Sequence, residues 1–108
     1  MTVDLSRCFV TVHDPELALG FYRDLLDLEV RMDVARGEFR WITVGSTDQP
    51  EVAIVLSNYL HGSAADVATV TSLLAKGALN AVHFRTANLD AVFARLRDAG
   101  VEVLDEPT

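Results

Sequence analysis

The sequence predicts an α+β fold made of two copies of one strand-helix-strand module, the second of them incomplete. The first observation is an internal repeat in which the stretch Thr86–Val103 follows the plan of Val12–Val30. The matching features are a polar cap (Asp14, Asn88), an acid two residues later (Glu16, Asp90), an Arg-Asp pair (Arg23-Asp24, Arg97-Asp98) and a closing Glu-Val pair (Glu29-Val30, Glu102-Val103). The second observation is a set of alternating stretches joined by short turns. A repeat of this length indicates a duplicated supersecondary unit.

Length and composition limit the classes of function. At 108 residues, half of them hydrophobic, the chain is one domain, 1–108, with room for a modest core. Its formal net charge of -7 gives no attraction to phosphate backbones or anionic lipid, so we expect neither nucleic-acid nor membrane partners. The single cysteine, Cys8, and the absence of a basic start or long apolar run predict a cytoplasmic protein.

The first predicted elements are a strand over 6–13 and a helix from Pro15 to Leu26. In the strand, Cys8, Val10 and Val12 are expected to face the helix, with Cys8 a small buried hydrophobe and not a nucleophile. Asp14 is the expected N-cap and Pro15 suits the first helical position. The predicted apolar stripe of the helix is Ala18, Phe21, Tyr22, Leu25 and Leu26. Gly20 within this helix predicts close packing against a neighbouring backbone.

Three further strands are predicted over 29–34, 39–45 and 51–57, joined by turns short enough to require antiparallel hairpins. Residues 1–58 thus form the first βαβββ module. Residues 59–79 are a linker containing a helix over 63–76, with Ser63 as cap and Gly77 as its end.

Residues 80–108 are predicted to begin the second module as strand, helix and strand. The first strand covers Asn80–Thr86, Asn88 caps the helix, Gly100 ends it, and Val101–Leu104 starts the next strand. By the repeat, two more strands, about 20 to 25 residues, would lie beyond Thr108.

The ordered motifs resemble the vicinal oxygen chelate superfamily, which includes glyoxalase I, bleomycin-resistance proteins and extradiol dioxygenases. The motifs are V-x-D-x-x-x-A-L-x-F-Y-R-D-L-L at Val12–Leu26, F-R-W-I-T-V-G at Phe39–Gly45, V-A-I-V-L at Val52–Leu56 and N-L-D-A-V-F-A-R-L-R-D-A-G-V-E-V from Asn88. The resemblance implies paired βαβββ modules that curl around one cleft. Function varies within such a frame, so the site is argued separately.

Metal-dependent members of this superfamily carry ligands at four positions, three of which fall at Arg7, about Val55 and Ala81 here; the fourth lies beyond Thr108. Arg is cationic, and Val and Ala have no donor atom, so we expect no metal cofactor. A register slip of two would bring His83 in place of Ala81, yet one imidazole does not make a site.

The predicted ligand-contacting residues come from the strands expected to face the cleft. They are Arg7, Phe9, Thr11, Trp41, Val55, His83 and Arg85, which together offer apolar area, guanidinium groups and an imidazole. Structural alternatives stay open: His83 as a core imidazole, Arg7 and Arg85 as rim ion pairs, and Trp41 as packing against the first helix. His13 could close a turn, and His61 could sit in an exposed loop or in a lid over the cleft.

The expected function is sequestration of a small, partly aromatic or anionic molecule, of the bleomycin-resistance type, with no catalytic residues. We expect a homodimer, swapped or unswapped, because the missing strands leave an edge to be covered. Two alternatives remain: a metal-dependent lyase, isomerase or dioxygenase of the same superfamily, and a dimerisation module that binds no ligand.

Overall fold

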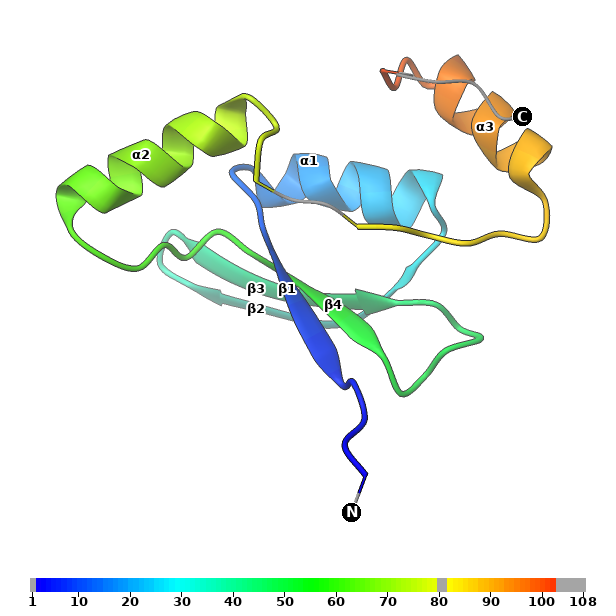
Figure 1. The fold of residues 1–108 in the computed structure, drawn as a ribbon, viewed down its shortest axis with the longest axis horizontal. Helices are drawn as coiled ribbons and strands as arrows, with labels where there is room; N and C mark the ends of the chain where they lie inside the picture. The colour runs from blue at the N-terminus through cyan, green and yellow to red at the C-terminus, as the bar shows by residue number, and fades with distance from the viewer. Residues whose placement is uncertain (1, 80–81, 103–108) are drawn as a thin grey trace.

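The computed structural model describes residues 2–79 and 82–102 and contains one mixed four-stranded sheet (Figure 1). Its strands are β1 (Arg7–Thr11), β2 (Glu29–Arg36), β3 (Phe39–Gly45) and β4 (Ala53–Ser57), in the spatial order β1-β4-β3-β2. β1 pairs in parallel with β4, whereas β2-β3 and β3-β4 are antiparallel. The predicted α+β class, the first βαβββ module and its hairpins are confirmed.

The first helix begins as predicted and then changes its pitch. The Asp14 carboxylate accepts hydrogen bonds from the backbone N–H groups of Glu16 (3.0 Å) and Leu17 (3.3 Å), and α1 runs from Pro15 to Leu19. A π-helical segment, η1 (Gly20–Leu25), follows directly. Because a π-helix has more residues per turn, it shifts the phase of the apolar stripe.

Two expectations for this helix were wrong. Leu19, outside the predicted stripe, is its only fully buried residue, at 2% exposure, while the predicted stripe residues are half-buried. A Cβ built on Gly20 would meet no atom within 4 Å, so Gly20 makes no close backbone contact. The glycine marks the point where α1 widens into η1 instead.

The core lies between the helical layer and one face of the sheet. Its buried members are Val10, Leu19, Ile42, Val44, Ile54 and Leu56, with Val12, Ala18 and Tyr22 packed against them. Val10 and Val12 therefore face the helix as predicted. Cys8 shares this face by alternation, but the prediction that it is buried was wrong: it is exposed, because it lies near the start of β1, an edge strand of the sheet, beyond the residues that the helix covers.

The remaining helices are α2 (Ala64–Ala75) and α3 (Leu89–Asp98). Ser63 and Asp66 form the expected capping box, Asn88 caps α3, and Gly77 and Gly100 adopt positive φ angles at the helix ends. None of the helices in the described ranges is long and apolar enough to cross a bilayer.

The expected second-module strand is not formed over its described part. Residues 82–86 have no strand assignment; Asn80 and Ala81 lie outside the described residues, as do Val103 and Leu104 of the next predicted strand. In the first module β1 is paired by β4. The segment instead contacts the helical layer: Val82 packs on the core, and Phe84 lies 6.2 Å from Tyr22 (ring centroids). In α3, which follows, an Arg95 Nη2–H donates to the Asp24 carbonyl (2.6 Å).

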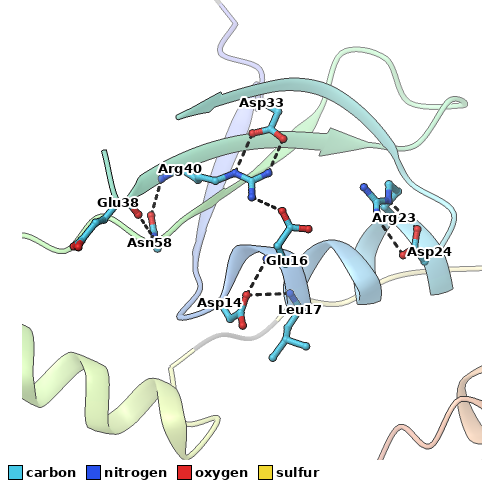
Figure 2. Close-up of polar contacts among 9 residues, drawn as sticks. All are labelled: Asp14, Glu16, Leu17, Arg23, Asp24, Asp33, Glu38, Arg40 and Asn58. Atoms are coloured by element: carbon cyan, nitrogen blue, oxygen red, sulfur yellow. Dashed lines mark hydrogen bonds and ion pairs between the residues drawn. The ribbon is translucent and has the colours of Figure 1, made fainter. Parts of the chain in front are cut away.

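Arg40 joins the β2-β3 hairpin to α1 through two carboxylates (Figure 2). Its guanidinium donates to both oxygens of Asp33 (3.2 and 2.6 Å) and to Glu16 of α1 (2.5 Å). These hydrogen bonds, to Asp33 first and then Glu16, raise the pKa of Arg40 above its ordinary value. Its backbone N–H donates to Asn58 Oδ1 (2.8 Å), so β3 is also held to the residue that follows β4.

Arg31 fixes the loop between β3 and β4. It lies at an irregularity in the β2-β3 register between Val30 and Met32, and its side chain turns to the loop. The guanidinium donates to four carbonyls, those of Ser46, Gln49, Pro50 and Val52, and to the Glu29 carboxylate. It occupies the space where a Cβ of residue 45 would be, since a Cβ on Gly45 would lie 2.5 Å from Arg31 Cζ. Gly45 is therefore required as long as Arg31 keeps these contacts.

We predict that Gly45→Ala lowers the free energy of unfolding by about 1–3 kcal/mol, because the guanidinium must leave its carbonyl acceptors. The effect should shrink in an Arg31→Met background, giving a coupling of about 0.5 kcal/mol or more in a double-mutant cycle measured by urea unfolding. Gly20→Ala is the control, expected to be neutral or stabilising because its Cβ meets nothing. Additive effects of the Gly45 and Arg31 substitutions would contradict this account.

A second prediction concerns alkaline pH. Burial raises the pKa of Tyr22, whose ring packs against the core. The folded state therefore holds the phenolic proton more tightly than the unfolded state, so its stability contribution is present below about pH 10 and is lost as pH rises through the folded pKa. Denaturant unfolding from pH 9 to 11 should show a shallower loss of stability in Tyr22→Phe than in the wild type. Equal slopes would show that Tyr22 has no such role.

Candidate functional site

The candidate site lies on the face of the sheet that α1 does not cover, here called the open face. Strand alternation and the observed register place four sets of side chains on it. They are Arg7, Phe9 and Thr11 of β1; Ala53, Val55 and Ser57 of β4; Phe39, Trp41 and Thr43 of β3; and Met32, Val34 and Arg36 of β2. Among the described elements, the helices lie on the opposite side of the sheet (Figure 1).

A hollow of about 410 Å³ occupies the β2-β3 half of the open face. Its lining consists of Met32, Val34, Arg36, Phe39, Arg40, Trp41, Ser57 and Tyr59. Met32, Val34 and Phe39 remain 46–47% exposed, so three large apolar side chains meet solvent side by side. A mostly apolar hollow of this size with few polar groups is typical of a small-molecule site.

An aromatic pair borders this hollow. The rings of Phe9 and Trp41 meet edge to face with centroids 5.0 Å apart. Because they come from β1 and β3, the contact spans β4, where Val55, the register partner of Phe9, is fully buried. Val55 therefore lies beneath the Phe9–Trp41 contact and is not accessible to a ligand. Thr43 Oγ1 is likewise buried there, without a hydrogen-bond partner in the described part of the chain.

Of the predicted ligand-contacting residues, five share the open face: Arg7, Phe9, Thr11, Trp41 and Val55. Trp41 lines the hollow and lies on the face away from the first helix, so the alternative of packing against that helix does not hold; its contact with a ligand stays a prediction. His83 and Arg85 are exposed on the segment whose Val82 and Phe84 contact the helical layer. The structure does not bring these two residues together with the other five. Their ligand-binding roles stay predictions.

Sequence reasoning missed most of the lining, namely Met32, Val34, Arg36, Phe39, Arg40 and Tyr59. A signal was present: alternate residues of β2 are Met32, Val34 and Arg36, and the hairpin turn sets Arg36 opposite Phe39 and Val34 opposite Trp41. The loop after β4 adds an aromatic cluster in which the Tyr59 ring meets those of Phe39 and His61 edge to face, with centroids 5.1 Å and 4.5 Å apart. This cluster extends the lining of the hollow past the end of the sheet.

A second hollow of about 310 Å³ lies between α2 and the end of β1. Its lining includes His13, Glu38 and Asn58 together with Val67, Thr71 and Leu74 of α2. The Asn58 amide group already has two partners: its oxygen accepts from the Arg40 backbone N–H, and its nitrogen donates to the Glu38 carbonyl at 3.0 Å. Phe39 borders both hollows, so they are adjacent but distinct.

The superfamily's metal positions do not fit a cation as far as they are described. Arg7 carries a positive charge, and Val55 is buried and has no donor atom. Ala81 lies outside the described residues. Within 2–79 and 82–102, no group of three His, Cys, Asp or Glu side chains is close enough to hold a metal ion. No chemical step is therefore assigned to a metal here.

Comparison with known proteins gives consistent relatives. Residues 4–108 match the model of the Glyoxalase/Bleomycin resistance protein/Dioxygenase superfamily. The uncharacterised protein YurT of Bacillus subtilis (strain 168) is 33% identical over 100 residues, covering 92% of this chain and 76% of its own.

Solved structures agree with this match. UcmS2 is 37% identical, with a TM-score of 0.84 over 100% of this chain and 83% of that one. TnmS3, an antibiotic binding protein from Streptomyces sp. CB03234, is 25% identical, with a TM-score of 0.70 over 99% of this chain and 78% of that one. Leishmania major glyoxalase I, at 14% identity and a TM-score of 0.69 over 99% of this chain and 73% of its own, shares the fold. The chain belongs to the Glyoxalase/Bleomycin resistance protein/Dioxygenase superfamily.

Proposed function

We propose that the protein binds a small, partly aromatic or anionic molecule in the hollow of the open face and acts by sequestering it. The observation that carries this proposal is the uncovered apolar wall around Trp41, made by Met32, Val34 and Phe39. Large apolar side chains that lie together in a concave, exposed surface are typical of a ligand-binding site, whereas single exposed apolar residues are ordinary.

The mechanism is burial of the ligand. Apolar contact with the wall removes ligand surface from water, at about 25 cal/mol per Å², and supplies most of the affinity. Trp41 offers a ring face or edge for an aromatic ligand, and its position is fixed by contact with Phe9. Sequestration requires no catalytic residue, and none is part of this proposal.

The relatives support this class of function. The similar structure of TnmS3 is that of an antibiotic binding protein, which makes antibiotic sequestration a reasonable model for this chain. We propose that binding proceeds without the superfamily's metal, since Arg7 and Val55 occupy two of its positions. Orientation of the ligand by Arg7, His83 and Arg85 is part of the same proposal.

We also propose a homodimer in the cytoplasm. β1 and β2 are the edge strands of the sheet, and the open face is apolar, so a second copy could cover either. Sedimentation velocity at micromolar protein concentration measures the oligomeric state directly. A single species of 11.8 kDa would contradict the proposed dimer.

The binding proposal predicts that an aromatic probe quenches Trp41, the only tryptophan in the chain. Titration with 1-anilinonaphthalene-8-sulfonate should give saturable energy transfer from Trp41 to the probe. Val34→Asp should weaken this binding about tenfold or more, because it places a charge in the apolar wall.

The matched control is Leu17→Asp, which makes the same change at a 75% exposed position on α1. It should leave binding within a factor of about two. Both variants must keep the wild-type far-ultraviolet circular dichroism. Equal effects of the two substitutions, or no saturable quenching in the wild type, would contradict the proposed site.

The metal-free proposal has a separate test. Protein purified and dialysed against a chelator-free buffer should contain far less than one equivalent of zinc, nickel, iron or manganese by elemental mass spectrometry. A near-stoichiometric metal that is lost in His83→Ala would instead establish a metal site and favour the lyase, isomerase or dioxygenase alternative.

A further inference from the structure

We infer that the hollow selects aromatic molecules bearing an acidic group, and that Arg36 is the residue that sets this preference. The inference rests on the proposed function, because it assigns a ligand class to the same hollow. Arg36 was not among the residues that the sequence singled out.

The position of Arg36 follows from the register of the hairpin. Arg36 pairs with Phe39, Val34 pairs with Trp41 and Met32 pairs with Thr43, so the three β2 side chains follow one another along the same face. All three line the hollow. From Met32 to Arg36 the strand advances about 13 Å, at roughly 3.3 Å per residue. The cation thus stands at one end of an apolar wall long enough for an aromatic body.

The Arg36 side chain also differs from those of the other two arginines in the hairpin, because it has no polar partner in the described part of the chain. Arg31 donates to four carbonyls and the Glu29 carboxylate, and Arg40 donates to Asp33 and Glu16. The Arg36 side chain makes no hydrogen bond or ion pair with any residue in the described ranges, although it lies in a chain that carries 16 acidic residues against 9 basic ones. Of the two arginines that line the hollow, Arg36 is the one whose donors are open to a ligand.

The chemistry of the guanidinium identifies the ligand class. Its planar array of N–H donors matches a carboxylate, sulfonate or phosphate through two parallel hydrogen bonds, which a lysine ammonium cannot reproduce. The net charge of -7 repels anions at a distance, so preference for an acidic ligand requires a specific local cation. A flat apolar body against Met32, Val34 and Trp41 would place its acidic group at Arg36.

The test compares two probes that differ by one group: 1-anilinonaphthalene-8-sulfonate and N-phenyl-1-naphthylamine, which has the same rings without the sulfonate. Both are titrated against Trp41 emission. We expect Arg36→Gln to raise the Kd of the sulfonate probe about tenfold and that of the neutral probe less than twofold. Arg36→Lys should lie between, because it keeps the charge but loses the planar donors.

The control is Arg97→Gln, which removes the same charge from an exposed position on α3. It should leave both Kd values unchanged. Three results would overturn the inference while leaving the hollow as a binding site. Arg36→Gln could weaken binding of both probes equally, Arg36→Gln could leave binding of the sulfonate probe unchanged, or Arg97→Gln could weaken binding of the sulfonate probe as much as Arg36→Gln does. Failure of both probes to bind the wild type would instead remove the proposed function itself.

Discussion

The structure depends on one constraint: side chains of a strand alternate between two faces, and this sheet is apolar on both while a helical layer covers only one. Val10, Ile42 and Leu56 are buried against α1, and they make the core. Their sequence neighbours Phe9 and Trp41 necessarily point the other way. The open face is thus produced by the same alternation that builds the core, and no helix in the described part of the chain covers its apolar residues.

Polar interactions then fix where the hollow lies on that face. Arg40 donates to Asp33 within the β2-β3 hairpin and to Glu16 of α1, which holds the hairpin to the helix, and it also lines the hollow. Arg31 holds the β3-β4 loop by its carbonyls. These arginines use their charge on the protein itself, whereas Arg36 does not. Two of the three arginines in this hairpin thus hold the surrounding structure in place, and the third is left to recognise a ligand.

The sequence was sufficient for the strands of the first module and for the helix caps, but not for the π-helical segment, for the described part of the strand expected over Asn80–Thr86 or for the packing. Caps and turns are local, so Asp14, Ser63 and Gly77 could be recognised from residue type alone. The π-helical turn after Leu19 could not, because it changes the period on which the stripe was read. The repeat related His83 and Arg85 to β1, but it carried no information on the contacts of Val82 and Phe84 that hold their segment against the helical layer. Arg36 was missed because its role depends on which acids the other arginines use.

The most direct test of the central claim is nuclear magnetic resonance mapping of the complex with 1-anilinonaphthalene-8-sulfonate. The account predicts that the largest shifts fall on the Trp41 indole N–H and on the methyl groups of Met32 and Val34, all on the open face. Shifts centred on Val67 and Leu74, which line the second hollow, with the Trp41 resonance unmoved, would contradict it.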